Sequence, residues 1–389
     1  MSRHTLKAAT GAYPSRGVIL VCAIVLMLAA WPVAASPHRP QVDMFLPAST
    51  PFWDKVARFG KAAAEDNDIR LAVHFADASR LKLLAQLKRR FASPSPPDGA
   101  IFPNFLETAP SLIKACEAAG IPCITFNSEL SPADQDLFGL PRQHYQYWIA
   151  QLVPDDAGSA YRLARLLLER ATQKYGSGHP LHMAAVTGYA ADAPSRVRMR
   201  ALRTALQEFP HVRLLQVFHT DWSETDAQRR TTGLLNRHRN VRIIWSSSSR
   251  ITSGILAAID NNPAHDINEL TINGYDLDAA LLLRISAGDL VGTAGGHYTE
   301  GAWAVVIMAD HLAGHSPQER VILTPQLLVT QNNVNQVTPL LAMLNTPDAL
   351  HRIDFSRFAR PETAYHFDLE PILEQLMTSA EPDPPVTMP

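Results

Sequence analysis

The sequence predicts an α/β protein made of two similar lobes, each a three-layer Rossmann-like unit with a parallel sheet, joined by a hinge of several strands. Three observations predict this class. Beyond residue 40, short apolar runs alternate with longer amphipathic stretches, which is typical of βαβ units. This alternation occurs twice, with an interruption between the two series. The chain has 389 residues, more than one hydrophobic core usually holds, so two lobes are expected.

The first series of elements forms the first lobe. Its strands are expected at Gln41–Leu46, Ile69–Phe75, Gly99–Phe102 and Cys123–Phe126. Its helices are expected at Phe52–Glu65, at Ser79–Phe91 and in a stretch that ends at Ala119. Gly120-Ile121-Pro122 ends that last helix, because glycine suits a helix C-terminus and proline cannot continue the helix.

The second series begins after a polar, proline-containing stretch, Ser128 to Tyr145. A helix is expected at Tyr161–Tyr175, where leucines and alanines recur at helical spacing. The strands of this second lobe are expected at His182–Thr187, Val212–Phe218, Val241–Trp245, Glu269–Asn273 and Leu290–Ala294. Beyond Thr330 the pattern is irregular.

The N-terminus predicts a cleaved secretory signal at residues 1–35. Scattered basic residues precede an apolar run, Val18 to Trp31, and the small residues Val33-Ala34-Ala35-Ser36 follow it. The run is too short to span a bilayer as a stable helix. A lipid anchor would need a cysteine directly after the run, whereas Cys22 lies inside it. The sequence therefore predicts an exported protein without a lipid anchor.

These patterns also predict where the chain passes between lobes. The first lobe is expected to comprise residues 36–150 and 297–325, and the second lobe residues 151–296 and 326–380. Hinge crossings are expected near Gln151, Gly296 and Pro325, and residues 381–389 form a proline-rich, flexible tail.

Composition excludes some partners. The chain has 35 basic and 37 acidic residues and no basic block, which argues against nucleic acid or an anionic membrane as the partner. After signal removal two cysteines remain, Cys116 and Cys123. An exported compartment permits a disulfide between them, and two ordinary buried thiols are the alternative.

Candidate functional residues follow the expected strands, because ligands of parallel α/β sheets collect at the carboxyl ends of the strands. In the first lobe these turns hold Ser49-Thr50-Pro51-Phe52-Trp53 and Asn127-Ser128. In the second lobe they hold Asp192 to Arg198, Asp221-Trp222, Ser246 to Ser249, Asp276 and Gly295-Gly296-His297-Tyr298. Aromatic faces from both lobes, surrounded by hydrogen-bonding groups, are typical of a site for a small polar ligand. Asp276 has an alternative role as the cap of the helix that follows it.

Catalytic and metal motifs are absent from the sequence. The serine run has no Gly-x-Ser-x-Gly context, and no phosphate-binding glycine loop occurs. His311 and His315 are four residues apart, but the glutamate of a zinc protease is missing between them. We therefore expect no enzyme activity, no metal and no cofactor.

Several short motifs, in this order along the chain, carry a family resemblance. They are Pro51-Phe52-Trp53, Pro97-Asp98-Gly99-Ala100-Ile101, Ala119-Gly120-Ile121-Pro122 before a strand that ends in Asn127, Arg198-x-x-Ala-Leu, Asn273-Gly274-Tyr275-Asp276 and Gly288-Asp289-Leu290-Val291-Gly292-Thr293. From about Val42 to Gly314 the chain resembles the type 1 periplasmic binding proteins, the group of ribose- and galactose-type sugar receptors and the autoinducer-2 receptor. The resemblance implies the type 1 periplasmic binding fold.

The resemblance also implies a ligand site between the lobes. Its ligand-binding residues would be Thr50, Phe52, Trp53, Asn127, Ser128, Arg198, Trp222, Ser248, Asp276 and His297. Sugar receptors of this type usually have Asn-Asp where this chain has Ser248-Ser249, and Asp-Arg where it has Asn127-Ser128. They also usually have Gln where this chain has Gly295-Gly296-His297. The first two departures remove charge and reach from the site and leave the identity of the ligand open.

Two functions are consistent with these features. The first is a monomeric binding protein that captures a sugar or sugar-like molecule and presents it to the membrane permease of an ABC-type importer. The second is a receptor that signals to a sensor kinase or chemoreceptor without transport, as the autoinducer-2 receptor resemblance suggests. An exported enzyme on the same lobes is a third, weaker hypothesis.

Overall fold

The computed structural model describes residues 1, 39–346, 348–359 and 364–378. The chain divides into a unit at residues 1–39 and a unit at residues 40–389, and the fold given below is that of the second unit. The expected secretory signal, apart from residue 1, and the expected tail at 381–389 lie outside the described residues. None of the described helices is long and apolar enough to cross a membrane.

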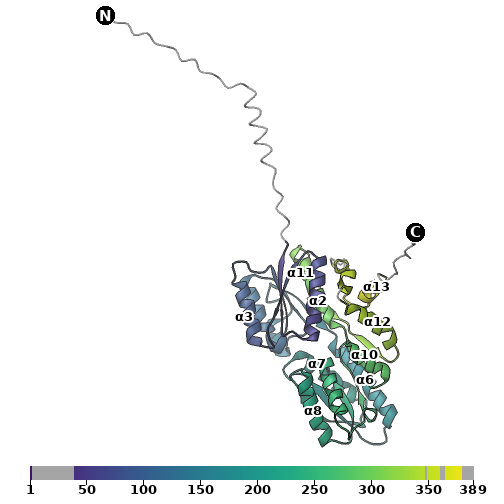
Figure 1. The fold of residues 1–389 in the computed structure, drawn as a ribbon. Helices are drawn as coiled ribbons and strands as arrows, with labels where there is room; N and C mark the ends of the chain where they lie inside the picture. The colour runs from purple at the N-terminus through teal and green to yellow at the C-terminus, as the bar shows by residue number, and fades with distance from the viewer. Residues whose placement is uncertain (2–38, 347, 360–363, 379–389) are drawn as a thin grey trace, which may run out of the picture. The chain divides into compact units, whose positions relative to one another are not determined.

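The first lobe is built on a six-stranded parallel sheet with the strand order β11-β5-β4-β3-β1-β2 (Figure 1). Its strands are β1 (Gln41–Leu46), β2 (Arg70–Phe75), β3 (Gly99–Pro103), β4 (Cys123–Phe126), β5 (Trp148–Pro154) and β11 (Val321–Thr324). Its helices are α2 (Pro51–Asp66), α3 (Arg80–Phe91), α4 (Ala109–Ala119), α5 (Pro132–Phe138) and α11 (Glu300–Leu312), with the short turns η1 (Phe105–Glu107) and η3 (His297–Thr299).

Helices cover both faces of this sheet, since successive side chains of a strand point to opposite sides. In β1, Met44 belongs to the buried cluster that includes α2 and α11, whereas Phe45 belongs to the cluster that includes α3 and α4. Both side chains are fully buried. The first lobe therefore has the predicted three layers.

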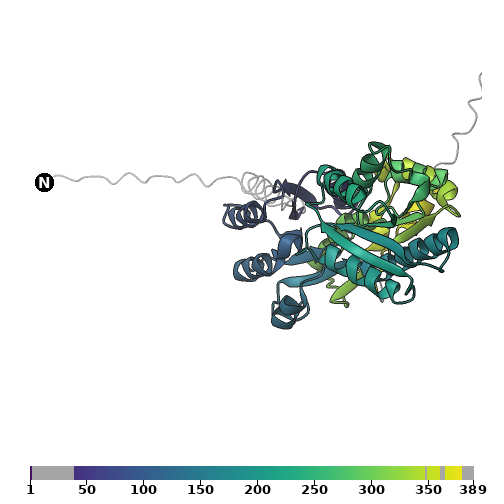
Figure 2. The same ribbon diagram turned by 90° about the horizontal axis from the view of Figure 1, so that it is seen from below.

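The second lobe has a four-stranded parallel sheet in the order β7-β6-β8-β9. Its strands are β6 (Leu181–Thr187), β7 (Val212–His219), β8 (Val241–Ser246) and β9 (Thr271–Ile272), and its helices are α6 (Asp156–Tyr175), α7 (Ala193–Leu206), α8 (Glu224–Arg237), α9 (Ser249–Asp260) and α10 (Ala279–Ala287). Met183 of β6 packs with α6 and α7, and Ala184 packs in the cluster of α8 and α9. Figure 2 shows helices on both sides of the teal strands of this sheet. The predicted fold class is confirmed.

Several strands differ from the sequence-based expectation, which placed no strand at β5, at β11 or at residues 327–330. No strand was expected at β5, although Trp148–Pro154 is almost entirely buried between β4 and β11. The expected strand at Leu290–Ala294 is β10 (Gly292–Gly295), and it pairs antiparallel with β12 (Leu327–Thr330) instead of joining the parallel sheet. A Cβ at Gly292 would lie 2.7 Å from the carbonyl oxygen of Val329, so the close approach of these strands needs glycine. Part of the expected strand at Glu269–Asn273 is instead the turn η2 (Ile267–Glu269).

The chain passes between the sheets of the two lobes at three places in the described residues. It leaves the first sheet at the end of β5 and enters α6, returns from β10 through η3 into α11, and leaves again between β11 and β12. These places are the end of β5 at Pro154, the turn at Gly296 and the turn at Pro325.

The C-terminal segment contacts both lobes, whereas residues 326–380 were expected to belong to the second lobe. It comprises α12 (Val334–Leu344), η4 (Ala349–Arg352), η5 (Phe355–Phe358) and α13 (Glu370–Thr378). Helix α12 packs on α10 of the second lobe. Phe355 and Phe367 instead bury their rings against Trp303 of α11 in the first lobe, at centroid distances of 5.9 and 4.7 Å. Figure 1 shows α12 and α13 side by side along this edge of the molecule.

Cys116 and Cys123 are buried free thiols in the core of the first lobe. Burial raises the pKa of the Cys123 thiol well above its usual value, and neighbouring Cys116 raises it further. Of the two alternatives that the sequence left open, the structure has the unbridged pair.

Candidate functional site

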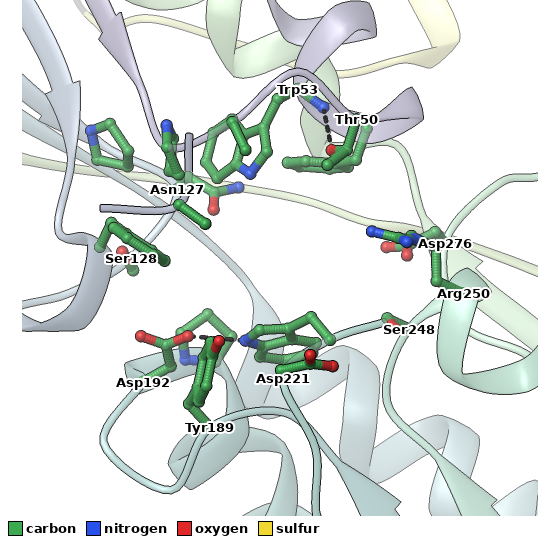
Figure 3. A pocket seen from close by; sticks show the side chains of 18 of the residues that line it. Thr50, Trp53, Asn127, Ser128, Tyr189, Asp192, Asp221, Ser248, Arg250 and Asp276 are labelled. Carbon is green, nitrogen blue, oxygen red and sulfur yellow. Dashed lines mark hydrogen bonds between the residues drawn. The ribbon is translucent and has the colours of Figure 1, made fainter. Parts of the chain in front are cut away.

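A cavity of about 210 Å³ lies where loops at the carboxyl ends of the strands of both lobes face each other. All ten residues proposed from the sequence line it: Thr50, Phe52, Trp53, Asn127, Ser128, Arg198, Trp222, Ser248, Asp276 and His297. Figure 3 shows Thr50, Trp53 and Asn127 on one side of the cavity and Asp192, Tyr189 and Asp221 on the opposite side. The structure thus brings the proposed residues together, and their contact with a ligand remains a prediction.

The start of helix α2 forms the aromatic part of the first-lobe wall. Thr50 is the N-cap, and its hydroxyl accepts a hydrogen bond from the Trp53 backbone N–H at 3.4 Å. Proline in the first turn suits a helix start, since its missing N–H would be unpaired there in any case. The rings of Phe52 and Trp53 meet edge to face at 5.0 Å, and Trp53 also packs on Phe126 at 6.1 Å. Both rings are half-buried at the edge of the cavity.

Asn127 and Ser128 continue this wall at the end of β4. Asn127 has a φ of 66°, a left-handed conformation that asparagine tolerates better than most residues. Both side chains are buried. The Asn127 amide nitrogen has no hydrogen-bond partner in the described structure, although buried polar groups usually have one. This nitrogen can donate to a molecule in the cavity.

Arg198 is the central cation of the second-lobe wall. Its Nε donates to Asp156 Oδ1 at 2.9 Å, its Nη2 lies 2.8 Å from the same oxygen, and its Nη1 donates to the Ser247 carbonyl at 2.7 Å. Its guanidinium also lies 4.0 Å from the centre of the Tyr275 ring. Burial by itself would lower the pKa of Arg198, but the Asp156 carboxylate raises it. The arginine is therefore charged and fixed in place, and two of its five N–H donors are left for other partners.

Trp222 adds an aromatic face from the second lobe. Its backbone is left-handed, with a φ of 65°, which is rare for a large side chain. A Cβ at Gly188 would lie 1.8 Å from the Trp222 ring, so the indole packs directly on this glycine. The indole Nε1 donates to Asp192 Oδ2 at 2.7 Å.

Ser248 and Asp276 lie together at the start of helix α9. The Ser248 hydroxyl caps α9 by accepting from the Ile251 N–H at 3.2 Å. Asp276 Oδ2 accepts from the Ser249 N–H at 2.9 Å. Asp276 thus binds the N-terminus of α9, while Asp278 caps the helix that follows it, α10. The alternative role expected for Asp276, as the cap of the following helix, is therefore wrong.

His297 lies near the Gly296 crossing, packed against Phe52 at a ring distance of 4.8 Å. Burial lowers the pKa of His297 to about 4, and the nearby Asp276 carboxylate opposes part of this change. The imidazole is therefore neutral at neutral pH. Its Nδ1 is buried without a hydrogen-bond partner in the described structure, and its Nε2 is 3.9 Å from Asp276 Oδ1.

A known protein family matches most of the chain. Residues 44–316 match the model of a family described as periplasmic binding protein domain. The chain belongs to this family. The match confirms the resemblance that the sequence motifs indicated, and it extends over most of the first lobe and the whole second sheet. A comparison with curated protein sequences gave no match.

Solved structures of this family share the fold. A periplasmic sugar-binding protein from Pseudomonas fluorescens is 24% identical, with a TM-score of 0.75 over 86% of this chain and 99% of that chain. An ABC transporter solute-binding protein from Actinobacillus succinogenes with bound D-allose is 18% identical, with a TM-score of 0.66 over 76% of this chain and 99% of that chain. One from Bacillus halodurans with bound myo-inositol is 15% identical, with a TM-score of 0.65 over 79% and 99%.

Several other residues line the cavity of this periplasmic binding protein, although the sequence did not identify them as site residues. They include Asn104, Phe105, Tyr189 and Arg250. Asp192 and Asp221 also line it; both were named in the candidate turns but not among the ten proposed ligand-binding residues. Arg250 is half-buried, and no hydrogen bond or ion pair of its side chain occurs in the described part of the chain. It directly follows the run Ser246 to Ser249, so its place after β8 was a signal that could have identified it.

Glu300 is a buried carboxyl group directly behind the first-lobe wall. It begins α11, is fully buried and accepts a hydrogen bond from Thr324. Burial raises the pKa of Glu300 to about 8, while the hydrogen bond that Thr324 donates lowers it in part. The Glu300 carboxyl group is therefore protonated in most molecules at neutral pH.

No metal centre is indicated among the described residues. Within residues 39–346, 348–359 and 364–378, no group of three or more His, Cys, Asp or Glu side chains is placed to hold a metal ion. What the arrangement offers is a set of aromatic faces with hydrogen-bonding groups between them, which is the chemistry of reversible binding.

Proposed function

We propose that the chain binds one sugar or sugar-like molecule between its lobes in the periplasm and presents it to an ABC-type importer. The observation that carries this proposal is the cavity between the lobes, with aromatic rings on both walls and unpartnered buried nitrogens on Asn127 and His297. Family membership supports a binding function without chemistry of its own, and the solved relatives include sugar-binding and ABC transporter solute-binding proteins.

The two walls suit the two sides of a sugar ring. Phe52 and Trp53 of the first lobe and Trp222 of the second can cover its apolar faces. Asn127 Nδ2, the remaining N–H groups of Arg198 and the oxygens of Asp276 can bind hydroxyl groups around its edge. A volume of about 210 Å³ suits one ring rather than a longer oligosaccharide.

Binding would favour the closed arrangement of the lobes, because the ligand touches both walls only when they face each other. We place the hinge at the three crossings near Pro154, Gly296 and Pro325. The permease would then recognise the closed form. Transport is the function for which relatives give support, since the solved neighbours include ABC transporter components.

The ligand can be identified directly. Mass spectrometry of small molecules released from protein purified without unfolding should find a monosaccharide or a related polyol. D-allose, myo-inositol and L-arabinose serve as probes in thermal-shift experiments, because related proteins bind sugars and polyols of this size. A chain that carries no such molecule and is stabilised by none of a broad panel of sugars and polyols would not be a sugar receptor.

A variant pair tests whether the cavity is the site. Trp53→Ala should weaken binding of the identified ligand by about 1–3 kcal/mol, as truncation of buried aromatic contacts usually does. Tyr147→Ala is the control, since Tyr147 is 40% exposed and does not line the cavity. Isothermal titration calorimetry measures both. Equal affinities of the two variants and the unmodified protein would remove the first-lobe wall from the site.

A strain lacking the protein distinguishes transport from signalling. Loss of uptake of the identified ligand would support the importer. Normal uptake with loss of a transcriptional or chemotactic response would support the receptor alternative.

A further inference from the structure

The Asp192 carboxylate, in the second lobe, accepts one hydrogen bond from a side chain that lines the cavity and another from the backbone of the first lobe. Asp192 directly precedes α7, a position where an aspartate side chain usually accepts from the N–H groups of its own helix. Here the side chain makes no such capping bond. Its Oδ2 accepts from the Trp222 indole at 2.7 Å, and its Oδ1 accepts from the backbone N–H of Leu106 at 3.1 Å. Trp222 belongs to the second lobe and Leu106 to the first.

Both donors are held by unusual backbone conformations. Leu106 has φ 46° and ψ 42°, the next residue, Glu107, has a φ of 59°, and Trp222 has a φ of 65°. Side-chain-bearing residues rarely adopt this left-handed region, and they stay there only when surrounding contacts hold them. Gly188 is part of the same arrangement, because any side chain there would displace the indole from its place. The backbone on both sides of the cleft is thus shaped around this carboxylate.

Because the Asp192 carboxylate is buried, its two hydrogen bonds compensate for its lost contact with water. Asp192 is 6% exposed, and burial raises its pKa, while the bonds from Trp222 and Leu106 lower it in part. A buried carboxylate that loses a donor keeps the cost of desolvation without compensation. Separation of the lobes would remove the Leu106 N–H from Oδ1 and let water take its place, so this bond is specific to the closed arrangement.

A neighbouring contact across the cleft lacks these properties. Arg196 lies 3.2 Å from Glu107, but the two side chains are 29% and 41% exposed. Exposed ion pairs contribute little, because water and salt screen them. This pair provides a matched control at the same place.

We propose that Asp192 is a positioning residue that couples the placement of Trp222 in the cavity to closure of the lobes. A ligand that packs on Trp222 fixes the indole, the indole fixes the carboxylate through Oδ2, and Oδ1 is then held toward the Leu106 N–H. In the reverse direction, closure fixes the indole against the ligand. The inference rests on the proposed binding function, and its test uses the full chain without ligand.

Hydrogen–deuterium exchange of the Leu106 amide tests the coupling, since this amide exchanges when its bond to Asp192 opens. Asp192→Ala should raise the exchange rate about tenfold, as expected for loss of a charge-assisted bond. Trp222→Phe keeps one aromatic ring but removes the indole donor together with part of the ring system. It should still raise exchange at Leu106 severalfold, and it should have no further effect in the Asp192→Ala background. Arg196→Gln, the control, should raise exchange at Leu106 far less than Asp192→Ala does, because its charge acts on Asp192 without a hydrogen bond to it.

Each outcome decides the proposal. Unchanged exchange in Asp192→Ala would show that the carboxylate does not hold the lobes together. Faster exchange in Asp192→Ala with unchanged exchange in Trp222→Phe would show a contact between lobes without coupling to the cavity. An effect of Arg196→Gln equal to that of Asp192→Ala would assign closure to general charge attraction. A separate thermal-shift panel on the unmodified protein tests sugar binding, so failure of that function is distinguishable from failure of the coupling.

Discussion

The two walls of the cavity differ in how their side chains are held. Phe52 and Trp53 of the first lobe begin a regular helix, capped by Thr50, and contact their neighbours mainly through ring packing. In the second lobe, Arg198 is fixed by Asp156 and Ser247, and Asp276 has a left-handed backbone with a φ of 68°.

This difference predicts different responses to substitution. Ring packing is non-directional, so changes in the first-lobe aromatics should affect ligand affinity with little effect on folding. A buried network of charges responds as a unit, so changes in the second-lobe wall should affect stability as well as binding. The first lobe would then supply contact area for the ligand, and the second lobe would fix the orientation of the ligand.

The largest expected effect comes from breaking the second-lobe network. Arg198→Ala leaves the Asp156 carboxylate buried without its cation, and loss of one partner of a buried ion pair costs about 3–5 kcal/mol. Urea unfolding should show this loss in the free energy of unfolding. Arg200→Ala, two residues further along α7 and exposed, is the control and should change stability by less than about 0.5 kcal/mol. Similar stabilities of the two variants would contradict the contrast between the walls.

Much of the cavity could be predicted from the sequence, because its residues follow strands. Parallel strands end at one edge of their sheet, so topology brings Thr50 and Asn127 together in the first lobe and Trp222 and Asp276 together in the second. The apolar runs of β1, β4, β6 and β8 were long enough to locate, and the turns after them were then fixed. No side-chain geometry was needed for this step.

Other features depend on contacts between distant segments. Asp192 was noted within a turn, but its bond to Leu106 depends on two consecutive left-handed residues that no local pattern indicates. Strand β5 was missed because the polar stretch before it obscured the rhythm of elements. The C-terminal segment packs on the first lobe because Trp303 offers a surface to Phe355 and Phe367, and such a choice of partner is not visible in a local sequence pattern.

The first-lobe wall has one buried ionisable group behind it, and Glu300→Gln tests whether its charge matters. The folded pKa of about 8 lies above the ordinary value of 4.5. Between these values the folded state keeps a proton that the unfolded state releases, so stability should fall as pH rises, by at most about 1.4 kcal/mol per pH unit. Glutamine resembles the protonated acid and does not titrate, so the variant should lose this decline.

Urea unfolding of both proteins from about pH 5 to about pH 9 measures the effect. The stability difference between variant and unmodified protein should grow in favour of the variant up to about pH 8 and then level off. Glu374→Gln, at an exposed position of α13, is the control and should give no such trend. A constant difference across this range would mean that Glu300 is ionised in the folded protein at neutral pH.

The smallest effect is expected at Arg250, which lines the second-lobe wall but is not tied into its network. Because no bond of its side chain occurs in the described structure, Arg250→Gln should leave stability unchanged. If its guanidinium donates to the ligand, affinity should fall by about 1 kcal/mol, roughly fivefold. Arg242→Gln, on β8 and outside the cavity, is the matched control for calorimetry with the identified ligand. A loss of stability in Arg250→Gln would place this arginine in the network with Arg198, and the second-lobe wall would then act as one unit from α7 to α9.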